Sequence, residues 1–128
     1  MNKIVEKFLK AEEAIITAHE GEVSLNDLYD EIPIGVRVIL VGKNGRKRIM
    51  DLGILSFILR NCNGEKFVKA YLDLSKSLDD IKKEFGVFTE LEFLSLCPEE
   101  KLQQLDKDLV YVLQKLKTYL SRRMREGS

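Results

Sequence analysis

Residues 36–51 read VRVILVGKNGRKRIMD and predict a β-hairpin. Runs of β-branched and large apolar residues flank Asn44-Gly45, and an Asn-Gly pair between such runs is the strongest short-range hairpin signal in a sequence. A second pair, Asn63-Gly64, also lies between apolar runs. Together the two pairs predict a three-stranded antiparallel β-meander over about residues 35–74.

Residues 51–74 also allow a helical interpretation. With Asp51 as a cap, one polar stripe of a helix would contain Gly53, Ser56, Arg60 and Asn63. A second helical stripe would run through Phe67, Tyr71, Leu74, Leu78, Ile81 and Phe85. We expect strands, because one turn at Asn63-Gly64 explains the apolar residues on both of its sides, and we expect a bulge or break near Gly53.

Helices are predicted before the meander. Apolar residues recur at helical spacing from Asn2 to about His19, and Gly21 ends that pattern. A short helix over 25–31 follows, because Ser24 with an acid three residues later resembles a capping arrangement.

Three helices are predicted after the meander. Ser77 with Asp80 opens a helix that Gly86 ends, and Thr89 opens a shorter one. The last helix begins at Pro98, which fits a first helical turn, and continues to the basic C-terminus. The expected fold is therefore α+β, with N-terminal helices and a long C-terminal helix packed on the sheet.

Composition indicates a soluble, globular chain. Its 128 residues, 45% apolar and 33% charged, suit one domain covering 1–128. The N-terminus lacks the uninterrupted apolar stretch of a signal peptide or a membrane span, so we expect a cytoplasmic protein without membrane contact. Cys62 and Cys97 are too few for a disulfide framework or a zinc site, and we expect two reduced thiols.

Charge is segregated along a chain whose 21 bases equal its 21 acids. Residues 11–36 contain no Lys or Arg and seven acids, namely Glu12, Glu13, Glu20, Glu22, Asp27, Asp30 and Glu31. Residues 37–50 contain five bases and no acid. Any affinity for a polyanion must therefore come from local patches instead of overall charge.

The basic hairpin leads to our first functional hypothesis, contact with nucleic-acid phosphates at low sequence selectivity. An exposed β-ribbon that carries cations can lie along a phosphate backbone of DNA or RNA. The candidate binding residues on the hairpin are Arg37, Lys43, Arg46, Lys47 and Arg48. The basic end of the last helix adds Arg122, Arg123 and Arg125. Alternatively, these cations only protect an edge strand from aggregation.

A protein-interaction module, acting as an adaptor or inhibitor, is the alternative function. The acidic segment from Glu12 to Glu31 would dock on a basic partner, or the hairpin would dock on an acidic one. The C-terminal helix carries a heptad stripe of apolar residues, namely Leu102, Leu105, Leu109, Val112, Leu116 and Tyr119. This stripe packs on the sheet, and its width also suits a second copy of the chain, so we expect a homodimer.

The sequence shows no constellation for catalysis, a metal or a cofactor. His19 is the single histidine, and no base and nucleophile can be paired. Gly42-Lys43 follows a predicted strand, but the spacing and hydroxyl residue of a phosphate-binding loop are missing. A helix-turn-helix over 77–96 would present Glu90 and Glu92 to phosphates, which argues against DNA reading there. We therefore expect a protein that is not an enzyme.

Overall fold

A computed structural model describes residues 3–11 and 15–126, with side chains described as far as Arg123. Its elements, in chain order, are α1 (Lys3–Lys10), β1 (Ile15–His19), the 3-10 helix η1 (Asn26–Tyr29), β2 (Arg37–Val41), β3 (Lys47–Asp51), α2 (Leu52–Asn61), α3 (Glu65–Leu72), α4 (Leu78–Phe85), α5 (Glu90–Leu94), α6 (Glu99–Leu102) and α7 (Lys107–Glu126). The predicted α+β class and the long C-terminal helix are confirmed.

The sheet has three strands in the order β1-β2-β3, and it is mixed. β2 and β3 pair antiparallel, with Ile39 opposite Ile49, as the hairpin prediction required. β1 pairs with β2 in parallel, with Thr17 opposite Ile39. The prediction of a purely antiparallel meander was therefore wrong, because the third strand precedes the hairpin in sequence.

The hairpin turn contains three residues, Lys43, Asn44 and Gly45, between the bonded pair Gly42 and Arg46. The N–H of Gly42 donates to the carbonyl of Arg46 at 2.8 Å. Gly45 has φ +81°, a left-handed conformation that glycine adopts without a steric penalty. The Asn44 carboxamide accepts the Arg46 N–H at 3.0 Å and fixes the loop.

The second Asn-Gly pair joins two helices, so the predicted strands over 51–74 were wrong there. Asn63 adopts φ +51°, and Gly64 caps the N-terminus of α3. A Cβ at Gly64 would clash with the Ile58 side chain, so this glycine allows α2 and α3 to approach closely. Asn-Gly here serves a helix-helix connection, which presents the same dipeptide signal as a hairpin.

α2 follows β3 directly, as the helical interpretation required. The Asp51 carboxylate caps the helix by accepting the Ile54 N–H at 3.0 Å. The segment Leu52–Leu59 is buried on all sides, which explains why it is apolar on both faces of a strand pattern. Gly53 marks a close approach, since a Cβ there would clash with the backbone of Pro33 and Ile34.

The predicted N-terminal helix ends early. α1 stops at Lys10, and Ile15–His19 forms strand β1, while residues 12–14 lie outside the described part of the chain. β-branched residues at 15–17 favour a pleated strand, and Ala18 is completely buried where the sheet leaves room for one small side chain. Here the spacing of apolar residues was consistent with either element.

The capping predictions are confirmed where a residue pair carries the signal. Ser77 and Asp80 form a reciprocal capping box, and Gly86 ends α4 at φ +80°. Thr89 caps α5 through the Glu92 N–H. The predicted single C-terminal helix is interrupted, however, because α6 ends at Leu102 before α7 begins.

The two cysteines form a disulfide, so the prediction of two reduced thiols was wrong. Cys62 at the end of α2 is bonded to Cys97, which follows α5. Their separation of 35 residues conceals the pairing in the sequence, and packing of α5 against α2 creates it.

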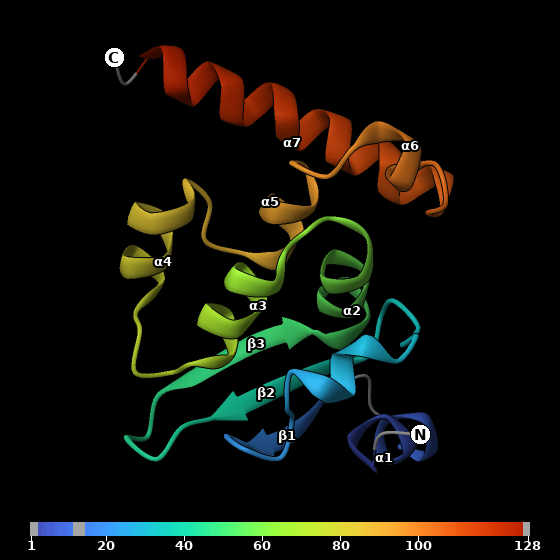
Figure 1. Ribbon diagram of the computed structural model, residues 1–128, viewed down its shortest axis with the longest axis vertical. Helices are drawn as coiled ribbons and strands as arrows, with labels where there is room; N and C mark the ends of the chain where they lie inside the picture. The colour runs from blue at the N-terminus through green and yellow to red at the C-terminus, as the bar shows by residue number, and fades with distance from the viewer. Residues whose placement is uncertain (1–2, 12–14, 127–128) are drawn as a thin grey trace.

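The elements are stacked along the long axis of the molecule (Figure 1). The sheet and its hairpin lie at one end, α2 and α3 cover one face of the sheet, and α7 crosses the opposite end beyond α5. The hairpin tip and the C-terminal half of α7 are therefore far apart.

Candidate functional site

Arg48, in the middle of β3, is a structural residue of the hairpin. Its side chain is only 8% exposed. The guanidinium donates to the carbonyl of Tyr71 at 2.6 Å and to that of Lys76 at 2.5 Å, and it lies 5.2 Å from the centroid of the Tyr71 ring. Burial lowers the pKa of this guanidinium from its ordinary value. Arg48 is thus not available to a polyanion in this fold.

Arg46 is held by the same segment of the chain. Its Nη1 donates to the carbonyls of Leu74 and Ser75 at 3.5 and 3.3 Å, although the side chain remains exposed. The other three hairpin candidates are Arg37, Lys43 and Lys47, whose side chains are exposed. The hairpin thus has fewer available cations than its sequence indicates.

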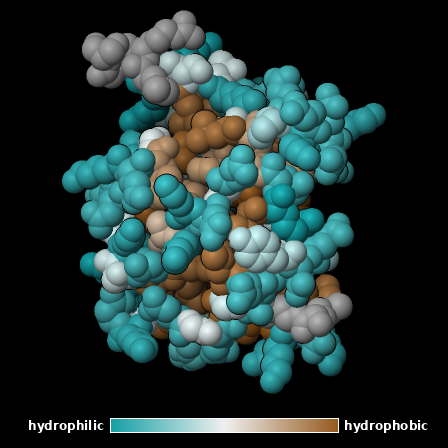
Figure 2. All heavy atoms as spheres, viewed as in Figure 1, coloured by the Kyte–Doolittle hydropathy of each residue, from teal (hydrophilic) through white to brown (hydrophobic). Residues whose placement is uncertain are grey.

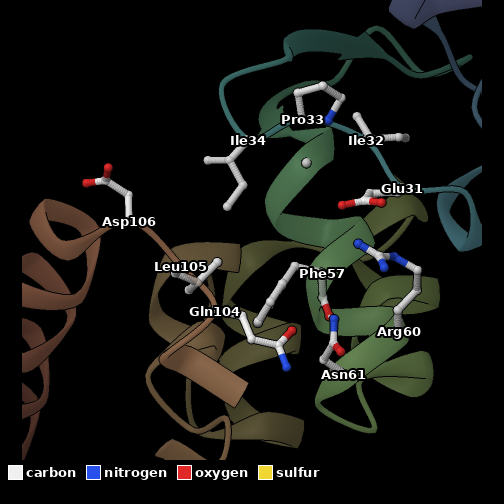
Figure 3. Close-up of a pocket in the computed structure, with 11 residues that line it drawn as sticks. Glu31, Ile32, Pro33, Ile34, Phe57, Arg60, Asn61, Gln104, Leu105 and Asp106 are labelled. Carbon is white, nitrogen blue, oxygen red and sulfur yellow. The ribbon is translucent and has the colours of Figure 1, made fainter. Parts of the chain in front are cut away.

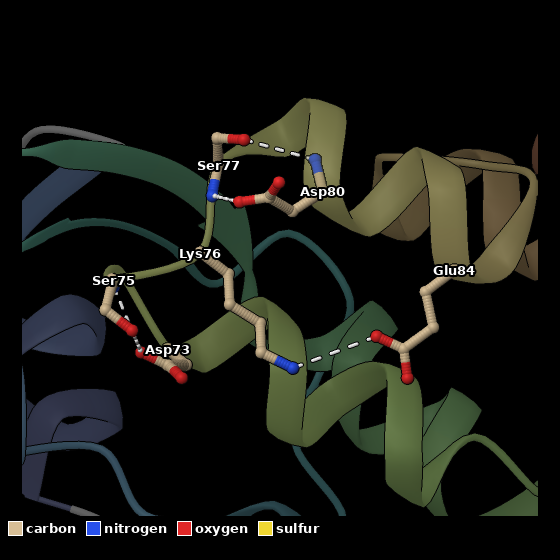
Figure 4. Close-up of polar contacts among 6 residues, drawn as sticks. All are labelled: Asp73, Ser75, Lys76, Ser77, Asp80 and Glu84. Atoms are coloured by element: carbon tan, nitrogen blue, oxygen red, sulfur yellow. Dashed lines mark hydrogen bonds and ion pairs between the residues drawn. The ribbon is translucent and has the colours of Figure 1, made fainter.

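The connection between α3 and α4 is shaped by local hydrogen bonds that present its carbonyls to the two arginines (Figure 4). The Asp73 carboxylate accepts the N–H and the hydroxyl of Ser75, at 3.0 and 2.5 Å. Hydrogen bonds from Ser75 lower the pKa of Asp73, and those from Ser77 lower the pKa of Asp80. Lys76 forms an ion pair with Glu84 at 3.8 Å.

The predicted cations of α7 do not join the hairpin. Arg122 and Arg123 are exposed on α7, at the opposite end of the long axis (Figure 1). Arg123 donates to the Tyr119 hydroxyl at 3.1 Å. The side chain of Arg125 lies outside the described part of the structure. The predicted nucleic-acid residues therefore do not form one surface.

The acidic N-terminal segment has local structural roles in its described part. Glu20 accepts the Leu74 N–H at 3.3 Å, and Glu22 accepts the His19 N–H at 3.0 Å. Asp27 accepts the Ser24 N–H at 2.9 Å. Glu12 and Glu13 lie outside the described residues, and Asp30 and Glu31 are exposed.

The predicted heptad stripe divides into a buried and an open part. Leu102 is buried, Leu105 and Leu109 pack against the core, and the buried anchor of α7 is Leu113, at 1% exposed. Farther along, Leu116 is half-buried and Tyr119 is 52% exposed. Val112 is also exposed. The second half of the helix therefore has apolar side chains that the described chain does not cover.

An apolar groove of about 830 Å³ runs between this half of α7 and the α4–α5 region. Its lining includes the apolar side chains Phe85, Val87, Phe88, Leu96, Leu116, Tyr119 and Leu120. Figure 2 shows hydrophobic side chains gathered on the surface at this end of the molecule. Charged groups at the groove are Lys82, Lys117, Arg123 and Glu92.

Sequence reasoning found the α7 wall of this groove and missed the other wall. Phe85, Phe88 and Leu96 were interpreted only as parts of packed helices. Phe88 and Leu96 flank α5 without belonging to it, which is a weak sign that they do not serve its core face. Their place beside α7 depends on a contact between α5 and α7 that no local pattern encodes.

A second cavity, of about 530 Å³, lies between α2 and the α6–α7 connection (Figure 3). Glu31 and Arg60 face one another at one side, and Asp106 lies at the other. Arg60 donates to the Ser56 hydroxyl at 3.3 Å, and Asn61 donates to the Phe57 carbonyl at 3.1 Å. These polar groups are engaged separately, and no nucleophile and base converge among the residues that line the cavity.

A buried polar cluster near the end of β3 also has a structural explanation. Asp51 accepts N–H groups from Gly35 and Ile54, and its own N–H donates to Glu90 at 3.0 Å. Burial raises the pKa of Asp51, and burial followed by the charge of Glu90 raises that of Tyr71. Every carboxylate contact here serves the backbone or Tyr71, and no cavity opens onto the cluster.

Comparison with protein-family models, with curated proteins and with solved structures finds no match to this chain. Within residues 3–11 and 15–126, no three His, Cys, Asp or Glu side chains gather closely enough to hold a metal ion. None of the helices in that described part has the length and hydrophobicity needed to cross a membrane. Function must be inferred from the surfaces described above.

Proposed function

We propose that this chain is a non-catalytic protein-interaction module, and that the groove between α4–α5 and α7 holds part of a partner protein. One observation carries the proposal. Large exposed apolar side chains concentrate in this layer, since four of the nine found among the described residues are Leu96, Tyr111, Val112 and Tyr119. Exposed apolar surface beside a groove is typical of a protein-binding site.

The charges of the molecule agree with this choice over nucleic-acid binding. Arg48 is buried and Arg46 is bonded to backbone carbonyls, while the basic end of α7 lies at the other end of the molecule. Binding to a phosphate backbone gains from several cations on one surface, because each neutralised phosphate releases counterions. Here the exposed cations are divided between two ends.

A pair of matched variants tests the proposal. Leu96 and Ile49 are each 58% exposed, but Leu96 lines the groove and Ile49 lies on the sheet near the hairpin. The immobilised full chain is incubated with nuclease-treated lysate of its source organism. We expect the same proteins to be retained by the wild type and by Ile49→Asp, and to be lost with Leu96→Asp.

Two results would reject the proposal. Equal retention by both variants would show that the groove binds nothing. Retention that disappears after nuclease treatment, and also in Lys43→Glu/Lys47→Glu, would assign the protein to nucleic-acid binding instead. Circular dichroism of each variant confirms that a loss of binding does not reflect unfolding.

A further inference from the structure

We infer that the occupant of the groove is an amphipathic helix of a partner protein with an acidic polar face. This inference rests on the proposed function and adds the shape and charge of the partner. It follows from the groove walls, from their cations and from the state of their single carboxylate.

The walls of the groove favour a helix over an extended segment. An extended peptide needs backbone hydrogen-bond partners, which an open strand edge provides. This groove is lined by side chains of α4, α5 and α7, whose backbone groups are bonded within the helices. A helix satisfies its own backbone and offers apolar side chains to such a surface, so it fits without leaving polar groups unpaired.

The spacing on α7 is that of a helix-packing ridge. Leu116, Tyr119, Leu120 and Arg123 follow one another at i, i+3, i+4 and i+7, so they lie along one face of α7. Eight residues of helix extend about 12 Å. The partner helix should therefore present about two to three turns to this face, with its apolar side chains on Leu96 and Leu116.

Cations stand on both walls of the groove. Lys82 comes from α4 and lies 5.6 Å from the centroid of the Phe88 ring, whereas Lys117 and Arg123 come from α7. Arg123 lies 5.8 Å from the centroid of the Tyr119 ring. These cations contact aromatic rings and hydroxyls, and the one ion pair found between described residues, Lys76 with Glu84, involves none of them.

The carboxylate in the groove does not balance these charges. Glu92 already accepts the Thr89 hydroxyl at 3.0 Å as part of the α5 cap. Three cations and one carboxylate leave a positive surface around an apolar floor. Such a surface attracts a helix whose apolar face is bordered by Glu and Asp, and it opposes one bordered by Lys and Arg.

Two designed peptides test the charge of the partner. Both are helices of about 18 residues with Leu at i, i+3, i+4 and i+7, and they differ only in carrying Glu or Lys at the exposed positions. Their binding to the full chain is measured by fluorescence anisotropy. We expect the Glu peptide to bind at least about tenfold more tightly, with a difference that shrinks as salt is added.

Charge-reversal variants locate the preference. Lys82→Glu/Lys117→Glu should reverse it, whereas Lys43→Glu/Lys47→Glu, a matched change at the hairpin, should leave it unchanged. Leu96→Asp should abolish binding of either peptide. A Glu peptide that does not bind, or a preference that survives Lys82→Glu/Lys117→Glu, would overturn the inference.

The outcomes separate this inference from the proposed function. Capture of natural partners that depends on Leu96, together with peptides that show no charge preference, would reject only the acidic helix. A homodimer that Leu96→Asp dissociates, measured by light scattering, would show that a second copy fills the groove and would also reject it. Capture that is independent of Leu96 would reject the function itself.

Discussion

The two ends of the molecule use charged side chains in opposite ways. At the hairpin, the guanidinium groups of Arg46 and Arg48 are bonded to carbonyls of the α3–α4 connection. At the α7 end, Lys82, Lys117 and Arg123 border an apolar groove. The denser cluster of cations in the sequence is thus the less available one. Availability depends on the partners that the fold supplies, and these cannot be counted along a chain.

The largest expected effect concerns the disulfide that joins the central helix α2 to the groove end. Reducing the Cys62–Cys97 bond should lower the free energy of unfolding by about 3–4 kcal/mol, because it restores the loop entropy of the unfolded chain. Urea denaturation with and without reductant measures this difference. In Cys62→Ala/Cys97→Ala, reductant should have no effect. A wild-type midpoint that reductant leaves unchanged would contradict the bond.

The next effect tests whether Arg48 is structural. Arg48→Met keeps an apolar stem but leaves the carbonyls of Tyr71 and Lys76 without their donor, so we expect a loss of about 2–3 kcal/mol of unfolding free energy. Arg46→Met, an exposed match with longer bonds, should cost less than about 1 kcal/mol. Equal stabilities of the two variants would show that burial does not distinguish these arginines.

A smaller effect should appear in acid at the hairpin end. The pKa values of Asp73 and Asp80 are lowered in the folded chain, so their contribution to stability is present above the unfolded pKa of about 3.9 and is lost as pH falls through the folded values. Burial raises the pKa of Asp51, which acts in the opposite direction.

Asp80→Asn isolates one of these contributions. The variant should lose less stability than the wild type between pH 7 and pH 3, because its capping residue no longer titrates. Thermal denaturation at both pH values gives the comparison. An identical loss in both proteins would mean that the Ser77–Asp80 cap does not depend on the charge of Asp80.

Sequence reasoning succeeded where a few adjacent residues determine the structure. The hairpin at Asn44-Gly45, the Ser77–Asp80 box and the Gly86 helix end are such cases. It failed at Asn63-Gly64 and at β1, where tertiary contacts chose between two elements that the local pattern allowed. Burial of α2 on all sides removed the polar stripe that would have identified it as a helix.

The candidate site was predictable only in part, for a related physical reason. The apolar stripe of α7 is a local pattern, and its open half was expected to bind a second helix. The opposite wall, with Phe88 and Leu96, depends on the fold. The disulfide also depends on it, since 35 residues separate its cysteines. Stable disulfides are typical of oxidising compartments and of hyperthermophile cytosol, so a cytoplasmic location stays a prediction.

Site-specific photo-crosslinking tests the central claim most directly, because it reports which surface touches the partner without perturbing charge. A photoreactive phenylalanine derivative replaces Leu96 in one protein and Ile49 in another, two positions of equal exposure at the groove and at the hairpin end. We predict cross-links to another protein from position 96 and none from position 49. Cross-links from position 49 alone, or to nucleic acid, would contradict the assignment of the groove as the binding surface.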